Sequence, residues 1–376
     1  MVKWDIFCNV VDNFGDIGVT WRLARQLVAD HGQSVRLWVD EPAVFAPLCP
    51  GADPMAESQW QQGVEIRHWR KEWPGAEPAD VVIEAFACQL PAPYLAEMAA
   101  RELRPHWLNL EYLSAEEWVA GCHGLPSFQS NGLLKYFYFP GFTPDTGGLL
   151  REAGLIERRC AFQADPAARR EFLQSLGVPL QEGAQLISLF AYENPALSGW
   201  LDQLASGQRP VQLLVPVGRV LGDVASWLGE NSLVAGAHLR RGSVSIHVLP
   251  FVSQDDYDRL LWSCELNAVR GEDSFVRAQW AGRPFLWHIY QQEADAHWEK
   301  LEAFLDLYLQ ELSPSAGLAL AEAWRAWNGG EGMAEAWAAL AVQWPELQRH
   351  AEQWCTVQAG QTDLATGLVQ FCTNSL

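Results

Sequence analysis

The chain has 376 residues, more than a single hydrophobic core usually serves, and its hydrophobic content of 49% suffices for two domains. Its 26 basic and 46 acidic residues give a net charge of −20, which disfavours nucleic acid and anionic membranes as partners and favours a basic one. The eight cysteines form no Cys-x-x-Cys pair, and neither a leader nor an apolar run of membrane-spanning length is visible, so we expect a cytoplasmic protein with reduced thiols and no metal.

The first strand-to-helix turn carries the most informative residues. An apolar stretch over residues 4–11 predicts a strand, and apolar residues recur at helical spacing from Trp21 to Val28. Between them lies the run Asp12-Asn13-Phe14-Gly15-Asp16-Ile17-Gly18. Open α/β sheets usually bind ligands at such a turn, but carboxylates repel phosphate. The turn is therefore predicted to face something other than a dinucleotide.

Short apolar runs alternate with helical patterns along the whole chain, which predicts two similar α/β domains with parallel sheets. The expected strands after the first are 35–39, 64–68, 81–85, 107–110, 186–190, 211–215, 244–249, 266–269 and 284–287. Glycine and proline crowd residues 121–150, which predicts a loop-rich crossing near a domain boundary. The tail over 318–370 is predicted to be helical, with Trp324, Trp327 and Trp337 in the core.

A second polar group follows the expected strand 266–269. The run Arg270-Gly271-Glu272-Asp273-Ser274 precedes a helical pattern, so Asp273 and Ser274 are predicted near a helix N-cap. Helix-start amides, a serine hydroxyl and a guanidinium together suit a diphosphate. Ordinary capping is the competing explanation for Asp273 and Ser274. Glu272 fits hydroxyls or a cation better than a cap.

Aromatic and amide side chains follow two other expected strands. These are Phe190 and Tyr192 after one strand, and Phe251, Gln254 and Tyr257 after another. They could stack on a nucleobase and bond its edge, although core packing also explains Phe190 and Phe251. The sequence has no P-loop, no Gly-x-Ser-x-Gly elbow and no His-Glu-x-x-His motif, which argues against an ATPase, a serine hydrolase or a zinc enzyme.

Together with Trp287-His288-Ile289-Tyr290-Gln291-Gln292, these motifs resemble the bacterial elongation factor P arginine rhamnosyltransferases over the whole chain. The resemblance implies an α/β GT-B glycosyltransferase fold, in which two facing Rossmann-like domains enclose a central cleft. It implies an acceptor-binding domain at 1–150, with a C-terminal helix at 355–376 packing back on it, and a nucleotide-sugar domain at 151–354. It also implies an inverting, metal-independent transfer of L-rhamnose from dTDP-β-L-rhamnose, a co-substrate rather than a cofactor, to an arginine of elongation factor P.

The resemblance implies a chemical role for the carboxylates of the first turn. A guanidinium is cationic and its nitrogens are poor nucleophiles, so other groups must orient and activate it. It implies Asp16 as general base, Asp12 as orienting group, and Glu272 as a contact from the other domain to the arginine or a sugar hydroxyl. The implied dTDP-rhamnose site comprises Asn13, Phe14, Gly15, Phe190, Tyr192, Phe251, Gln254, Tyr257, Arg270, Glu272, Asp273 and Ser274.

Three alternatives stay open at this point. Asp12 and Asp16 could simply cap the turn. The chain could be a GT-B transferase for another acceptor, or a non-catalytic protein that binds elongation factor P or a nucleotide sugar. A monomer is the default expectation for a two-domain enzyme of this kind.

Overall fold

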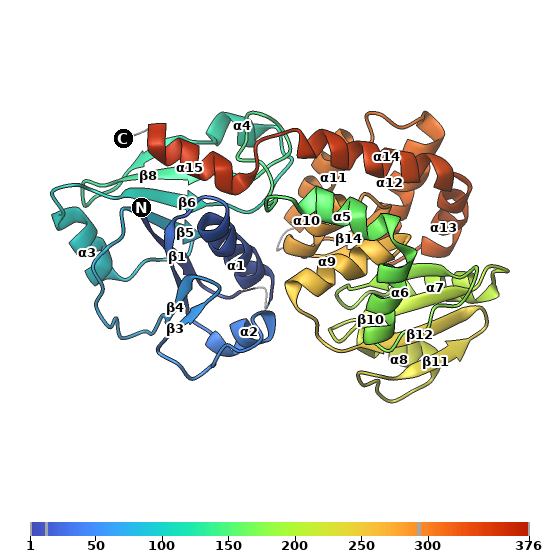
Figure 1. Ribbon diagram of the computed structural model, residues 1–376. Helices are drawn as coiled ribbons and strands as arrows, with labels where there is room; N and C mark the ends of the chain where they lie inside the picture. Colours follow the sequence, from blue (N-terminus) through green and yellow to red (C-terminus); the bar gives the residue numbers. More distant parts are fainter. Residues whose placement is uncertain (1, 12–13, 292–294, 375–376) are drawn as a thin grey trace. The chain divides into compact units, whose positions relative to one another are not determined.

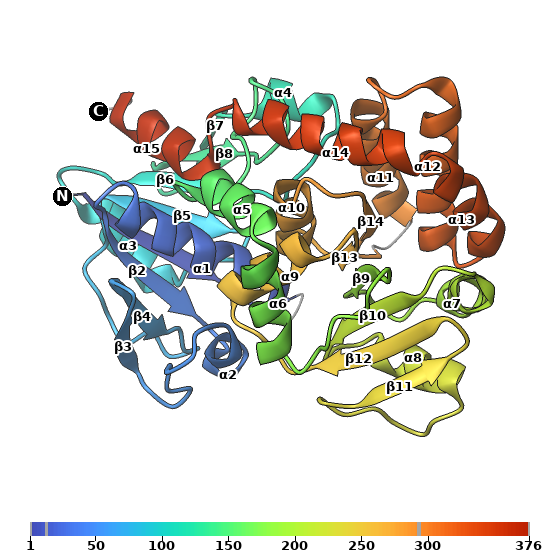
Figure 2. The same ribbon diagram turned by 45° about the vertical axis from the view of Figure 1, so that its right-hand side comes forward.

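The computed structural model describes residues 2–11, 14–291 and 295–374 (Figures 1 and 2). The chain divides into two compact units: unit 1 is Met1–Ala153 with Gln358–Leu376, and unit 2 is Gly154–Val357. Each unit contains one mainly parallel sheet with helices packed against it. Within the described ranges, no helix combines the length and the apolar character needed to cross a membrane.

Unit 1 is built on eight strands in the order β3-β4-β2-β1-β5-β6-β8-β7. They are β1 (Lys3–Cys8), β2 (Ser34–Val39), β3 (Ser58–Gln61), β4 (Val64–His68), β5 (Val81–Ala85), β6 (His106–Leu110), β7 (Pro126–Phe128) and β8 (Leu134–Tyr138). Neighbouring strands run parallel except in the edge pairs β3–β4 and β7–β8. The chain passes from β1 to β2 on one side and later returns to β5 on the other, so the strand order reverses at β1.

The helices of unit 1 are α1 (Phe14–Ala29), α2 (Pro42–Phe45), the short 3-10 helix η1 (Ala46–Leu48), α3 (Ala92–Ala100), α4 (Trp118–Cys122) and α15 (Leu364–Asn374).

Asp5 ties two strands together inside the fold. Its fully buried carboxylate accepts bonds of 2.6 Å from both Nε and Nη2 of Arg36, and one of 3.2 Å from Nε1 of Trp38. This pair fixes β1 against β2, and β1 leads to the predicted acidic turn.

Unit 2 has six strands in the order β11-β12-β10-β9-β13-β14, and only β11 runs antiparallel to its neighbour. They are β9 (Gln185–Leu189), β10 (Val211–Pro216), β11 (His238–Arg241), β12 (Val244–Leu249), β13 (Leu266–Arg270) and β14 (Phe285–His288). Here the strand order reverses at β9, which has β10 on one side and β13 on the other.

Helices flank the sheet of unit 2 and form its C-terminal part. They are α5 (Leu155–Ala164), α6 (Pro166–Ser175), α7 (Leu197–Ser206), α8 (Leu221–Leu228), α9 (Gln254–Ser263), α10 (Asp273–Trp280), α11 (Ala296–Tyr308), α12 (Pro314–Gly329), α13 (Met333–Val342) and α14 (Trp344–Ala359). The predicted burial of Trp324, Trp327 and Trp337 is confirmed, since none of them is more than 7% exposed.

Two sequence expectations differ from the structure. Residues 121–150 contain β7 and β8 rather than only loop, because β8 pairs with β6 despite the surrounding glycines and prolines. The expected helix over 355–376 is instead the last turn of α14 followed by α15. A break occurs between them, and Asp363 begins the new helix by accepting hydrogen bonds from the amide and hydroxyl of Thr366. Gln26 of α1 holds this start in unit 1 through a bond of 2.9 Å to Asp363.

A buried ion pair joins α9 to α10 in unit 2. Nε and Nη2 of Arg277 donate to the two carboxylate oxygens of Asp258 at 2.8 and 2.6 Å. The two side chains are only 1% and 6% exposed. Both charged groups are buried, so their mutual attraction offsets part of the free energy that each loses on leaving water.

We therefore expect Asp258→Ala to lower the free energy of unfolding by about 3–5 kcal/mol, because it removes the carboxylate that accepts two hydrogen bonds from the buried Arg277 guanidinium. The matched control is Glu302→Ala, which breaks the two-bond pair with Arg325, whose side chains are 48% and 37% exposed. That loss should stay within about 1 kcal/mol. Urea denaturation of both variants checks the prediction, and equal losses would contradict it.

Candidate functional site

The carboxyl end of β1, where the strand order of unit 1 reverses, carries the predicted acidic turn. Asp12 and Asn13 lie outside the described residues. Phe14 and Gly15 begin α1, and Asp16 lies in its first turn with 3% of its surface exposed. Oδ2 of Asp16 accepts a hydrogen bond of 2.8 Å from the amide of Val11, just after β1. This bond holds the carboxylate against the end of the strand.

A second carboxylate, which the sequence analysis missed, holds the same segment. Asp40 follows β2 and accepts a bond of 3.0 Å from the amide of Val10 and another from the side-chain amide of Asn9. Burial and then the charges of Asp16, Cys88 and Asp40 raise the pKa of the Cys8 thiol well above its usual value. A bond with Thr20 acts in the opposite direction. This end of the sheet is therefore locally acidic.

In unit 2, an arginine occupies the corresponding reversal of strand order. Arg270 is the last residue of β13 and is 7% exposed. Its guanidinium carbon lies 4.6 Å from the ring centre of Phe190 and 4.7 Å from that of Tyr192, both of which follow β9. Nη1 of Arg270 is buried and finds no hydrogen-bond partner in the part of the chain that the structure describes. An anionic ligand would satisfy this donor.

The turn after Arg270 is braced from two sides. Gly271 has a φ of 59°, a conformation that favours glycine, and its carbonyl accepts a bond of 2.8 Å from Nε1 of Trp287. Oγ of Ser274 accepts a bond of 3.1 Å from the amide of Arg270 and donates to the carbonyl of the same residue. The sequence pattern predicted that the Ser274 hydroxyl could bind a phosphate. In the structure this hydroxyl bonds the backbone of Arg270 and holds the turn closed.

The start of α10 follows this turn. Glu272 is the N-cap residue, its side chain makes no capping hydrogen bond, and Asp273 is the first helical residue. The first amides of a helix have no partners within the helix, so they suit an anion such as a phosphate. The prediction that Asp273 and Ser274 lie near a helix start is confirmed.

The remaining predicted residues lie at the carboxyl ends of β9 and β12. The ring of Tyr257 is 5.7 Å from that of Phe190 in an edge-to-face arrangement. Burial raises the pKa of Tyr257, although the Ser274 hydroxyl counters this effect, so the phenol stays neutral. Phe251 lies half-buried between β12 and α9, and Gln254 is the buried first residue of α9. The structure therefore brings Phe190, Tyr192, Tyr257, Arg270 and Ser274 together in one cluster.

His288 was absent from the predicted site set but belongs to this cluster. It ends β14, next to Arg270 in the sheet, and its ring lies 5.3 Å from that of Tyr192. It is 2% exposed, and its Nδ1 has no hydrogen-bond partner among the described residues. Burial, followed by the charge of Arg270, lowers the pKa of His288 to about 4. A polar residue at the end of the apolar strand Phe285–His288 was the available signal.

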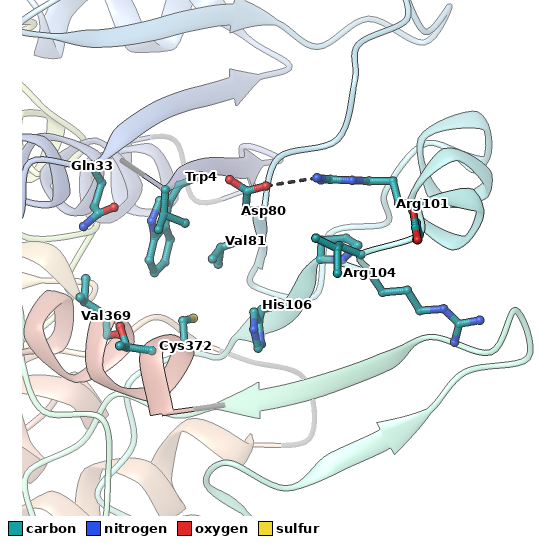
Figure 3. A pocket seen from close by; sticks show the side chains of 14 residues that line it. Trp4, Gln33, Asp80, Val81, Arg101, Arg104, His106, Val369 and Cys372 are labelled. Carbon is teal, nitrogen blue, oxygen red and sulfur yellow. Dashed lines mark hydrogen bonds and ion pairs between the residues drawn. The ribbon is translucent and has the colours of Figure 1, made fainter. Parts of the chain in front are cut away.

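A cavity of about 550 Å³ lies at the other end of the unit 1 sheet, and Figure 3 shows the side chains that line it. It is lined by the starts of β1, β5 and β6 and by α15, through residues such as Trp4, Val81, His106 and Cys372. Arg101 and Asp80 form an ion pair of 3.1 Å on its wall. The predicted site residues are not among those that line it. It is therefore separate from the carboxyl ends of the strands.

Solved structures of glycosyltransferases share this architecture. The chain matches MurG of Acinetobacter baumannii with a TM-score of 0.50 and 13% identity over 100% of this chain and 99% of the other. It matches an alpha-glucosyltransferase in complex with UDP and a 13-mer DNA with a TM-score of 0.53 and 9% identity, over all of both chains. These glycosyltransferases have the GT-B fold, and the two parallel-rich sheets of this chain match it, which confirms the predicted fold class.

Within that class the family is clear. Residues 4–373 match the model of Elongation-Factor P (EF-P) rhamnosyltransferase EarP, and the chain belongs to this family. It is 64% identical to the protein-arginine rhamnosyltransferase of Pseudomonas putida and 60% identical to that of Pseudomonas aeruginosa, with 99% of each chain covered in both cases. A solved structure that concerns EarP-mediated arginine glycosylation of translation elongation factor EF-P matches with a TM-score of 0.72 and 46% identity over all of both chains. The chain is thus a glycosyltransferase, as the sequence analysis predicted.

The lowered pKa of His288 predicts how the free energy of unfolding depends on pH. The folded protein protonates His288 near pH 4, whereas an unfolded chain protonates a histidine near pH 6.5. The unfolded state therefore binds the extra proton first, and the free energy of unfolding falls as the pH drops from 6.5 towards 4. Between pH 7 and pH 5 this contribution amounts to about 2 kcal/mol.

We expect His288→Gln to reduce the loss of stability between pH 7 and pH 5 by that amount. Urea denaturation of the variant and the unmodified protein at both pH values measures the difference. An equal loss in both proteins would mean that folded His288 is already protonated at pH 5.

Proposed function

We propose that this chain transfers L-rhamnose from dTDP-β-L-rhamnose to an arginine of elongation factor P, with inversion at the sugar carbon. One observation carries the proposal beyond family membership. The two reversals of strand order have opposite chemistry: Asp16 and Asp40 make the one in unit 1 acidic, and Arg270 makes the one in unit 2 cationic. A cationic arginine suits the first, and a nucleoside diphosphate suits the second.

The donor would bind in unit 2. The diphosphate would accept hydrogen bonds from Nη1 of Arg270 and from the first amides of α10, while the base would lie among Phe190, Tyr192, Phe251 and Tyr257 with Gln254 at its edge. Negative charge grows on the leaving diphosphate as its bond to C1 breaks. Arg270 and the helix-start amides would stabilise that charge without a metal ion.

The acceptor would bind in unit 1. As the guanidinium nitrogen forms its bond to C1 and the C1–O bond to the diphosphate breaks, the Asp16 carboxylate would take the proton from that nitrogen. The bond from the Val11 amide fixes the orientation of the carboxylate before the substrate arrives. Asp12 is proposed to orient the guanidinium, and Glu272 to hold the arginine or a sugar hydroxyl.

The decisive test is incubation of the protein with elongation factor P and dTDP-rhamnose, followed by intact-mass analysis of the acceptor. We expect the addition of one deoxyhexose on an arginine. Asp16→Asn should abolish this addition, because an amide cannot accept the proton, and should leave the affinity for dTDP nearly intact. The exposed residue Asp145 of unit 1 provides the control variant Asp145→Asn, which should keep full turnover.

No mass change with the unmodified protein under saturating donor would favour a binding protein over an enzyme. Retained turnover by Asp16→Asn together with lost dTDP binding would overturn the assignment of the general base.

A calorimetric measurement of dTDP binding tests the donor site. Arg270→Gln removes one charge-assisted hydrogen bond and should weaken binding by about 10- to 100-fold. Ser274→Ala should weaken it less, because the turn that holds Arg270 loses the hydrogen bonds of the Ser274 hydroxyl. Arg325→Gln, from an exposed ion pair of the same unit, is the control and should bind dTDP normally. Unchanged affinity in Arg270→Gln would remove this residue from the phosphate site.

A further inference from the structure

An unusual backbone turn follows β5 in unit 1. Four residues other than glycine have a positive φ among those that the structure describes, and two of them are neighbours: Phe86 at 56° and Ala87 at 55°. Side chains with a Cβ are strained in this left-handed conformation, and such strain persists only where the surroundings impose it. Strained residues of this kind cluster at functional sites.

The adjacent strand imposes the turn. The amide of Phe86 donates to the carbonyl of Leu110 at 2.8 Å, and the amide of Ala87 donates to Oδ1 of Asn109 at 3.1 Å. Asn109 is 1% exposed, so its amide group is held firmly in the fold. The amide of Cys88 then closes the turn on the carbonyl of Ala85 at 3.2 Å. Each amide of the turn is thus bonded, and the conformation is fixed rather than loose.

The turn presents an aromatic ring beside a second one. The ring of Phe86 stacks on that of Tyr112, which follows β6, with centroids 4.6 Å apart and planes 20° apart. Both residues are half-buried, and neither belongs to the hydrophobic cluster around Phe7 and Trp38 that fills this side of the sheet. Packing of that cluster therefore does not account for the stacked pair.

The stacked rings of Phe86 and Tyr112 lie at the carboxyl ends of the strands, as Asp16 does. The thiol of Cys88, directly after the turn, bonds the carbonyl of Phe7 in β1 at 3.3 Å. The neighbouring Cys8 is close enough to both Asp16 and Cys88 for their charges to raise its pKa. The stacked rings and the carboxylates thus belong to one small region at the reversal of strand order.

We propose that Phe86 and Tyr112 form an aromatic subsite that packs against the guanidinium of the acceptor arginine. A planar guanidinium stacks on an aromatic face, whereas a lysine ammonium lacks that geometry, so the subsite favours arginine over lysine. The rings orient the cation while Asp16 takes its proton. This inference rests on the proposed function, because it presupposes an arginine acceptor.

The test measures steady-state rhamnosylation by the full chain at saturating dTDP-rhamnose while the concentration of elongation factor P varies. Phe86→Leu and Tyr112→Leu remove one ring each and should raise the KM for elongation factor P by about tenfold. Their affinity for dTDP, measured by calorimetry, should stay within about twofold of that of the unmodified protein. Phe86→Tyr and Tyr112→Phe retain both rings and should retain the KM.

A second aromatic pair of unit 1 supplies the control. Phe371 packs edge-to-face on Tyr136 at 5.4 Å, and both are half-buried. Phe371→Ala should leave the KM for elongation factor P unchanged. An unchanged KM in Phe86→Leu and Tyr112→Leu, with an active unmodified protein, would overturn the inference and leave the proposed function intact.

Three further outcomes are informative. If Phe86→Leu fails to fold, Tyr112→Leu decides alone, because the backbone of Tyr112 is not left-handed. If the ring-retaining variants raise the KM as much as the leucine variants do, the aromatic faces are not the recognised feature and the inference fails. Inactivity of the unmodified protein would instead overturn the proposed function on which the inference rests.

Discussion

The reversal of strand order in each sheet is the constraint on which the rest of the structure depends. The chain continues from β1 to β2 on one side and later adds β5 on the other, and β9 likewise lies between β10 and β13. The connections at the carboxyl ends of these strands therefore diverge and expose backbone and side chains. Almost every residue with a proposed role lies within a few positions of such a strand end. Asp16 follows β1, and Arg270 ends β13 beside β9. The helices and the buried core serve to hold these ends in place.

Polar side chains near the two reversals act largely on the backbone. Asp16 and Asp40 bond the successive amides of Val11 and Val10, and Ser274 bonds both the amide and the carbonyl of Arg270. These bonds determine where the next side chains point before any substrate arrives. A site built in this way needs little rearrangement when it binds, which favours catalysis.

The sequence predicts the parallel strands well, because strands buried on both faces read as continuous apolar runs. Each expected strand after the first lies within one residue of an observed one, whereas the first ends at Cys8 instead of residue 11. The edge strands β3, β7 and β11 were missed because they are short and largely polar, as Ser58–Gln61 and His238–Arg241 illustrate. The parallel strand β8 was missed because glycines and prolines surround it. The cluster around Arg270 was predictable from residues that follow strands. Asp40 and the left-handed Phe86 were not, because the role of Asp40 depends on its position beside the segment after β1 and no residue type indicates the positive φ of Phe86.

The acidity at the end of β1 has a chemical consequence for the cysteine beside it. Alkylating reagents and peroxides react with thiolates, and burial together with Asp16 and Asp40 keeps Cys8 in its thiol form. Burial likewise raises the pKa of Cys88 above its usual value. By contrast, Cys160 of α5 is exposed to solvent. Oxidative damage or a covalent label should therefore reach Cys160 while sparing the thiols nearest to Asp16.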